Sequence, residues 1–221
     1  MKRVPYPLLV IGLDGASPQV LDALAERLPH ITQLRREGAS GVARSTQPPA
    51  TFPAWTSVLT GCPPEVHGIR DMLTRDTPTS VLRPVSGVER RVPLIVQELA
   101  RAGHSVACLG VPGLHPPPQE SGAWIAGFDA PGADQAGPGA VFPPSLYREV
   151  RACGGWRYAT FNEQRFQLEA ATDALISDID DKARLIQSVA RSRRWDLFFV
   201  HLQASDTACH HLWPSWDRSS P

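Results

Sequence analysis

The sequence lacks an excess of charge of either sign, and this absence narrows the range of partners. Lysine plus arginine and aspartate plus glutamate number 22 each, so the formal net charge is zero. Without a basic excess, electrostatics give no support for a polyanionic partner such as nucleic acid, although a local basic pocket is compatible with a neutral total. We therefore expect no nucleic-acid partner.

The sequence also lacks long apolar runs and paired cysteine motifs. No stretch approaches the ~20 apolar residues of a membrane-spanning helix. The amino terminus begins like a signal peptide, but its apolar run covers only residues 7–13 and has no convincing cleavage site. None of the four cysteines lies in a CxxC pair, which is typical of free thiols in a reducing compartment: Cys62, Cys108, Cys153 and Cys209. These absences predict a soluble, cytoplasmic protein without a membrane span.

The apolar residues that are present suffice for one sizeable core, because 42% of the 221 residues are hydrophobic. Residues 7–13 form a continuous apolar run, as expected for a strand that is buried on both faces. Residues 104–110 and 195–202 are two further strand candidates. Segments with helical spacing lie between them: residues 17–38, 54–61, 92–102 and 166–191. This alternation predicts an α/β fold, with a mostly parallel sheet and helices on both of its faces.

Local signals refine this prediction. Ser17 before Pro18 is typical of a helix start, Gly38 ends the same helix, and Pro29 kinks or divides it. The helix over residues 166–191 has an apolar side: Leu168, Ala171, Leu175, Ile179, Ile186 and Val189. Residues 111–139 are rich in proline and glycine and read as long loops, and a small cap insertion is expected at about residues 130–165.

Polar residues lie where an α/β fold places its ligands, just past the end of a predicted strand or at the start of a predicted helix. Asp14 follows the first strand, although an aspartate there is commonly a turn former. Thr51 lies just before a short helix, whose positive end suits a phosphate, and a hydroxyl there can attack phosphorus if its pKa is lowered. The alternative is that Thr51 only caps the helix. Thr46, Thr56 and Ser57 are other hydroxyls nearby.

A third group, Asp206 with His210, follows the last predicted strand. In a helix, a spacing of four puts both side chains on one face, where a carboxylate and an imidazole are natural zinc ligands. Cys209 and His211 offer a rival ligand set, but in a helix we expect them to point away from that face. Together with Asp14 and Thr51, this group predicts a site with two metal ions that clamp an in-line displacement.

At these residues the sequence resembles the type I phosphodiesterase and nucleotide pyrophosphatase branch of the alkaline phosphatase superfamily. Five strings match in the family's order between Val10 and Trp213: VIGLDGASPQVL, LPHITQLRREGASG, PPATFPAWTSVLTGCPPEVHGI, WIAGFDAPG and FFVHLQASDTACHHLW. The resemblance implies an alkaline-phosphatase-like fold and a metal-dependent hydrolase of small phosphoesters, with phosphodiesters as the first expectation. His67, in the family's His-Gly-Ile string, is expected to be structural support.

The resemblance also implies residue roles. Thr51 matches the family's nucleophile, which also touches one metal ion, and Asp14 matches a ligand of the same ion. Asp206 and His210 match two ligands of the second ion. The family's metals are usually zinc, and manganese is an alternative.

Departures from the family pattern bear on activity. Ala54 stands where nucleotide pyrophosphatases have an asparagine, and the sequence has no Cys-x-Pro-x-Arg string of a sulfatase. The family's second Asp-His pair and a further histidine, which complete both metal sites, are not found before Pro221. We therefore expect residues 1–221 to be the N-terminal part of a single domain, inactive alone, with an open sheet edge and an uncovered apolar face. The alternatives are a non-catalytic phosphate-binding remnant, a phosphoryl transferase or a phosphomonoesterase.

Overall fold

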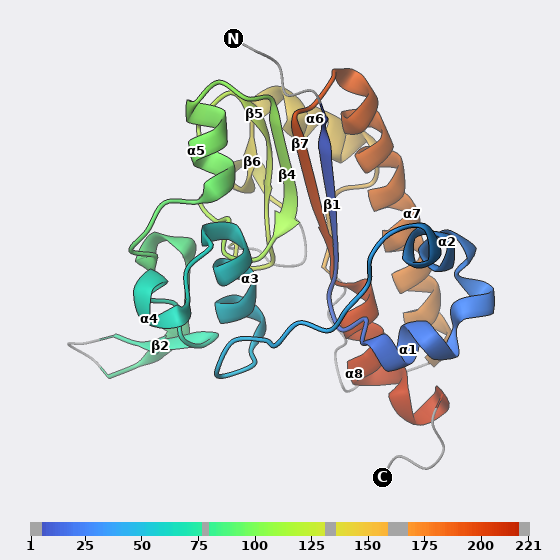
Figure 1. The fold of residues 1–221 in the computed structure, drawn as a ribbon. Helices are drawn as coiled ribbons and strands as arrows, with labels where there is room; N and C mark the ends of the chain where they lie inside the picture. Colours follow the sequence, from blue (N-terminus) through green and yellow to red (C-terminus); the bar gives the residue numbers. More distant parts are fainter. Residues whose placement is uncertain (1–5, 77–79, 131–135, 159–167, 217–221) are drawn as a thin grey trace.

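A computed structural model describes residues 6–76, 80–130, 136–158 and 168–216 (Figure 1). Its main sheet has five strands in the order β1-β7-β4-β5-β6, and every neighbouring pair is parallel except β5 with β6. The strands are β1 (Leu8–Leu13), β4 (Val106–Val111), β5 (Gly122–Ala126), β6 (Val141–Phe142) and β7 (Leu197–Leu202). The three apolar segments of the sequence are the adjacent strands β1, β7 and β4, which confirms the mostly parallel α/β fold.

Helices cover both faces of this sheet. The α-helices are α1 (Pro18–Ala23), α2 (Pro29–Glu37), α3 (Thr51–Thr60), α4 (Pro64–His67), α5 (Ile95–Arg101), α6 (Pro144–Ala152), α7 (Leu168–Ser192) and α8 (Ala204–Trp216). Short 3₁₀ turns are η1 (Ala25–Arg27), η2 (Gly87–Glu89) and η3 (Pro138–Ala140). As predicted, Pro29 divides the first helical segment by opening α2, and Gly61 ends α3 in the left-handed region with a φ of 69°.

Two apolar cores lie on opposite faces of β4. Leu109 and Ala107 face a core that α6 and α7 complete with Leu146 and Leu185. Residues of alternate register, Val106 and Cys108 among them, face a second core that α3 and α5 close. Figure 1 shows α3 and α5 together on one side of the strands, and α7 on the other. Burial on both faces explains why the strand prediction from a continuous apolar run succeeds for β4.

Strand β1 departs from that prediction. Leu8, Leu9 and Ile11 are 59%, 60% and 54% exposed, so the expected burial on both faces is wrong for this strand. Within the described ranges β1 pairs only with β7 and forms an edge of the sheet. No residue of α1 or α2 is buried. Leu8, Leu9 and Ile11 therefore form an uncovered apolar surface at this edge of the described sheet.

The inward face of α7 also differs from the prediction. Leu175 and Val189 are buried as expected, but Ile179 is 43% exposed. Charged side chains occupy buried positions instead, and with two arginines they form the α7 ion cluster: Asp178, Asp181, Lys182, Arg157 and Arg184. Apolar periodicity misses this face because paired charges can be buried when each has an opposite partner.

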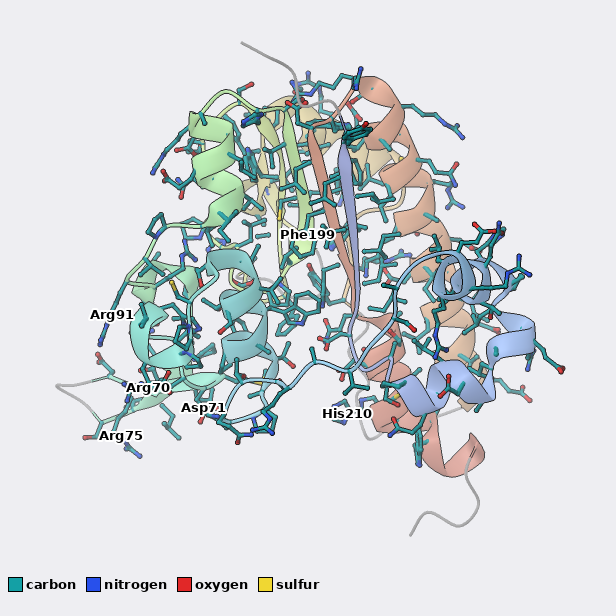
Figure 2. All side chains as sticks on the ribbon, in the orientation of Figure 1. Arg70, Asp71, Arg75, Arg91, Phe199 and His210 are labelled. Carbon is teal, nitrogen blue, oxygen red and sulfur yellow. The ribbon has the colours of Figure 1, made fainter. Side chains whose placement is uncertain are left out.

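Three further strands, β2 (Leu73–Arg75), β3 (Leu82–Pro84) and β5, were not predicted. β5 lies inside the stretch read as long loops, because its five residues are too few and too uniformly buried to show a period. Strands β2 and β3 form a separate antiparallel pair. Figure 2 shows Arg70, Arg75 and Arg91 around this pair and α4.

The region of the expected cap is described in part. Residues 136–158 form η3, β6 and α6, and Leu146 and Val150 of α6 are buried. Residues 131–135 and 159–167 lie outside the described ranges, so the cap stays a prediction. All four cysteines are free, as expected. Of the helices described here, none is long and apolar enough to cross a membrane.

Candidate functional site

Parallel pairing of β1 and β7 brings the polar residues after both strands together at the carboxyl ends of the strands, called here the carboxyl edge of the sheet. Leu13 lies opposite Leu202, and the N–H of Asp14 donates to the carbonyl of Leu202 at 3.0 Å. The Ser205 hydroxyl donates to the carbonyl of Asp14 at 2.6 Å. These bonds join the turn after β1 to the first turn of α8, which carries Asp206. The structure thus brings Asp14 and Asp206 into one site.

The close approach of these two turns depends on Gly15. Its φ is 70°, and a Cβ atom built there would lie 2.7 Å from the Cα of Asp206. A side chain at this position would therefore be strained and would push α8 away from β1. The DGA string after the first strand is explained by this contact.

Asp206 and His210 share one face of α8, as their spacing predicts. His210 Nε2 lies 3.4 Å from Asp206 Oδ1, and the His210 side chain is 73% exposed. Figure 2 places His210 beyond the carboxyl ends of the strands. Burial raises the pKa of Asp206, and the nearby charge of Asp14 raises it further, while the neighbouring histidines oppose the shift.

Cys209 corrects one expectation. Its thiol donates to the carbonyl of Gly15 at 3.7 Å, and burial together with Asp206 raises its pKa. It therefore lies over the turn after β1 and does not point away from Asp206. The reason is geometric, because residues three apart on a helix are also neighbours.

His201, which the sequence analysis did not select, completes the surroundings of Asp14. It lies in β7 opposite Gly12 of β1, is fully buried, and places Nε2 3.4 Å from Asp14 Oδ2. The ring of Trp55 packs edge-on against it at a centroid distance of 4.5 Å. A polar residue inside the apolar run LFFVHL, shortly before Asp206 in the sequence, is the signal that could have identified it.

Thr51 is the first residue of α3 and lies on a neighbouring element. The helix is capped by Ala50 without a side-chain hydrogen bond, so Thr51 is not the cap. In the described part of the chain, no hydrogen bond or ion pair joins Thr51 to Asp14. Trp55, one turn further along α3, provides the link through its contact with His201. The described contacts thus connect the helix that begins at Thr51 to Asp14 through Trp55 and His201.

The other hydroxyls near Thr51 have different surroundings. Thr46 Oγ1 donates to the carbonyl of Pro48 at 2.9 Å, and Ser57 Oγ lies 3.0 Å from His67 Nε2. Thr56 Oγ1 is buried and has no hydrogen-bond partner within the described ranges. Thr46 and Ser57 thus have local partners. None of these three hydroxyls lies at the first position of α3, which is occupied by Thr51.

His67 is buried between α3 and α4. Its Nδ1 accepts the N–H of Ile69 at 3.1 Å, so Nε2 carries the proton and can donate to Ser57. Burial lowers the pKa of His67, which favours the neutral ring that both bonds require. These bonds fix the turn after α4, as the interpretation of structural support implies.

The residues around Asp14 fit a divalent cation in part. Asp14 Oδ2 is buried and has no hydrogen-bond partner among the described residues, and no lysine or arginine there makes an ion pair with Asp14 or Asp206. Two neighbouring carboxylates without a permanent cation, next to imidazoles, form a donor set that divalent metals accept. However, no group of three or more potential ligands with metal-binding geometry occurs in the described part. Among the described residues, Asp14, Asp206 and His210 therefore do not by themselves make a complete metal site.

A second polar cluster lies beyond the carboxyl ends of β4 and β5. Asp129 Oδ2 accepts the N–H of His115 at 3.1 Å, and Arg90 donates to the carbonyl of Gly113 at 2.8 Å. Burial raises the pKa of Asp129 to about 6, against the effect of backbone donors and Arg90. Phe128 connects this loop to α3, because its ring packs against Phe52 at 5.3 Å.

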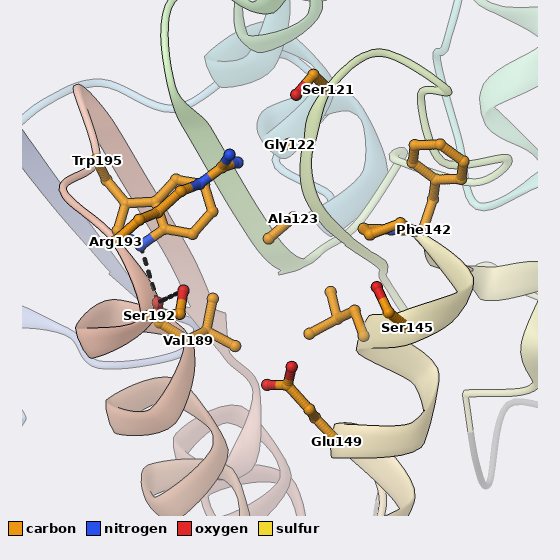
Figure 3. Close-up of a pocket in the computed structure, with 12 residues that line it drawn as sticks. Ser121, Gly122, Ala123, Phe142, Ser145, Glu149, Val189, Ser192, Arg193 and Trp195 are labelled. Atoms are coloured by element: carbon orange, nitrogen blue, oxygen red, sulfur yellow. Dashed lines mark hydrogen bonds between the residues drawn. The ribbon is translucent and has the colours of Figure 1, made fainter.

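The cavity in Figure 3 is lined by residues at the amino ends of two strands of the sheet. It has a volume of about 390 Å³ and opens beside the amino ends of β5 and β7, near Gly122 and Trp195. The Arg193 guanidinium stacks on the Trp195 ring at 4.0 Å. Asp14 and Asp206 follow the carboxyl ends of their strands, so this cavity is separate from the candidate site.

Comparison with known sequences agrees with these observations. The family described as type I phosphodiesterase / nucleotide pyrophosphatase matches residues 8–220. A mouse (Mus musculus) protein, ectonucleotide pyrophosphatase/phosphodiesterase family member 3, is 32% identical over 88 residues, which are 39% of this chain and 10% of that protein.

Solved structures show the same fold. Phosphonoacetate hydrolase from Sinorhizobium meliloti 1021 in complex with phosphonoformate superposes with a TM-score of 0.56 at 20% identity. The match covers 90% of this chain and 46% of that structure, and the complex with phosphonoacetate gives 91% and 47% at the same TM-score. The fold is therefore alkaline-phosphatase-like, and the chain spans about half the length of these structures.

Proposed function

Because this chain belongs to the type I phosphodiesterase / nucleotide pyrophosphatase family of phosphoester hydrolases, we propose that it supplies the nucleophile and part of the metal site of a metal-dependent phosphodiesterase. The observation that carries the proposal is the pairing of Asp14 with Asp206 beside α3. Both carboxylates lie at the carboxyl edge of the sheet, and Asp14 Oδ2 is buried there without a hydrogen-bond partner in the described ranges.

In this proposal Thr51 is the nucleophile. Its Oγ attacks phosphorus, the alcohol leaves, and a phosphothreonine forms, which water then cleaves to return the Thr51 hydroxyl. The amino end of α3 carries free N–H groups and a positive dipole end, which suit the phosphoryl oxygens. Asp14 and Thr51 would hold one divalent ion and Asp206 and His210 the other, with zinc expected and manganese as the alternative. Such ions supply charge stabilisation to the displacement.

We infer that these 221 residues alone turn over slowly or not at all. The described part contains fewer ligands than a four-coordinate zinc site needs. Two other functions use the same residues. A non-catalytic phosphate-binding remnant would need only the amino end of α3, and a phosphoryl transferase or phosphomonoesterase would differ in acceptor or substrate.

The test compares the 221-residue chain with the product of the full reading frame. Bis(4-nitrophenyl) phosphate is offered with Zn²⁺ or Mn²⁺, and Thr51→Ala is compared with Thr46→Ala as a matched hydroxyl control. We expect turnover only in the longer product, and a loss of about 10³-fold or more in Thr51→Ala alone.

Other outcomes would decide against parts of the proposal. Activity that survives Thr51→Ala would exclude this nucleophile. Metal-dependent activity of the 221-residue chain, abolished by Thr51→Ala, would overturn the inference of an inactive chain. Stoichiometric phosphate binding by a stable monomer, without hydrolysis by either product, would favour the binding remnant.

A further inference from the structure

His201 is a buried polar residue to which the proposed function gives no role. Its side chain is fully buried in β7, and neither ring nitrogen has a hydrogen-bond partner in the described part of the chain. Asp14 Oδ2 lies 3.4 Å from His201 Nε2. A buried imidazole that makes no other bond, beside a buried carboxylate oxygen that makes none either, indicates a direct relation between the two groups.

The position of the ring is fixed from the side of α3. Trp55 packs edge-on against His201 at 4.5 Å, and it also covers Gly12, where a Cβ atom would lie 2.4 Å from the indole. Gly12 and His201 are register partners across β1 and β7. The Trp55 ring therefore occupies the space that a side chain at position 12 would need. From there it packs against the His201 imidazole, which faces Asp14.

His201 Nε2 and Asp14 Oδ2 make no hydrogen bond in the structure, but a small movement of either side chain would form one. The 3.4 Å gap exceeds the usual N–H···O range by only a few tenths of an ångström. A neutral imidazole with its proton on Nε2 would donate to Oδ2 and would leave Oδ1 as the free oxygen. Metal ligands in proteins are commonly oriented by such a bond from a neighbouring side chain.

We propose that His201 is a positioning residue that donates from Nε2 to Asp14 Oδ2 and holds the Asp14 carboxylate in the orientation that a divalent cation requires. This inference rests on the proposed function, which makes Asp14 a metal ligand. It also couples the start of α3 to the acidic pair, because Trp55 lies one turn after Thr51.

Two substitutions at His201 distinguish the loss of the hydrogen-bond donor from a change in side-chain volume. His201→Phe keeps a ring against Trp55 but cannot donate, whereas His201→Gln retains an N–H donor. His104→Phe is the matched control, because His104 Nδ1 lies 3.5 Å from Asp196 Oδ2 at the other end of β7. Far-ultraviolet circular dichroism and denaturant unfolding verify that each variant folds.

The first measurement is titration of the metal-free chain with Mn²⁺ by calorimetry. We expect His201→Phe to weaken binding about 10- to 100-fold, His201→Gln to stay within about 3-fold of the wild type, and His104→Phe to leave affinity unchanged. Unchanged affinity in a folded His201→Phe variant would overturn the proposal. Equal losses in the Phe and Gln variants would overturn it in favour of direct ligation by His201.

The second measurement needs no metal. Nitrogen-15 chemical shifts of the imidazole report which ring nitrogen carries the proton, and we expect the Nε2–H form, with its signal moved by Asp14→Asn. An Nδ1–H form, or a signal that ignores Asp14→Asn, would overturn the hydrogen bond. If the wild-type 221-residue chain binds no Mn²⁺, the proposed function still stands, because this chain alone has few ligands. In that case the tautomer and its response to Asp14→Asn alone decide the contact between His201 and Asp14.

Discussion

Two acidic regions of this molecule differ in whether lysine or arginine side chains neutralise their carboxylates. In the α7 ion cluster, Lys182 lies 2.6 Å from Asp178, and Asp181 contacts Arg157 and Arg184. At the carboxyl edge of the sheet, Asp14 and Asp206 have only histidines as ion-pair partners in the described ranges. The first region contains its own cations, and the second does not.

The difference predicts which acidic residues are structural and which are functional. Buried charges that are paired stabilise one packing arrangement, and their loss shows in folding. Neighbouring carboxylates without a cation repel each other, and this arrangement is typical of a site that receives its charge from a ligand. The comparison predicts that substitutions in the two regions change the free energy of unfolding in opposite directions.

The largest expected effect is in the α7 ion cluster. Lys182→Met leaves Asp178 buried without its closest cation and also removes the contacts of the ammonium with Trp156 and Tyr158 at 5.4 and 5.0 Å. We expect a loss of about 3–5 kcal/mol in the free energy of unfolding, measured with urea. The double variant Asp178→Asn with Lys182→Met is the control and should lose less, because no unpaired charge remains. Equal losses would show that packing, not charge, governs this cluster.

Asp129 is an intermediate case, since it lies near Arg90 but burial dominates. Its pKa is raised to about 6 from 3.8, so the folded state holds the proton more tightly than the unfolded state does. The contribution of this group to stability is complete below about pH 4 and is lost as the pH rises through about 6. We expect Asp129→Asn to be more stable than the wild type at pH 7.5, by at most about 3 kcal/mol, and to differ little at pH 4. A stability difference that does not change with pH would contradict this.

A smaller gain in stability than that of Asp129→Asn is expected from substituting Asp206 at the candidate site. The pKa of Asp206 is raised by burial and by Asp14, so the contribution of this group to the stability of the metal-free chain is lost as the pH rises above the ordinary range of an aspartate. In EDTA at pH 7.5, Asp206→Asn should match or exceed the wild type, by up to about 1 kcal/mol. It should also abolish any stabilisation by added Zn²⁺ or Mn²⁺. A clear loss of stability in EDTA would place Asp206 with the structural acids.

The smallest effect on folding is expected at the exposed edge. Leu9→Lys on β1 changes a side chain that is 60% exposed, so the free energy of unfolding should change by less than about 0.5 kcal/mol. Self-association should fall, because the exposed apolar edge becomes charged. Light scattering over a concentration series measures this. Val10→Lys is the control, since Val10 packs against a core and its substitution should destabilise the fold.

The sequence predicts the framework well because local patterns determine it. Apolar runs identify β1, β4 and β7, and proline and glycine mark the division before α2 and the end of α3. The carboxyl ends of parallel strands meet at one edge, so Asp14 and Asp206 could be assigned to one site in advance. Their spacing and type, with the family resemblance, predict the proposed metal ligands.

Only the tertiary structure decides which surfaces and side chains meet. The exposure of β1 depends on its place at the edge, and the burial of Lys182 depends on Asp178 and the rings beside it. The contact of His201 with Asp14 requires β7 beside β1 and Trp55 packed over Gly12. Periodicity reports the average polarity around an element, whereas pairing of individual buried charges is a long-range property that no local window contains.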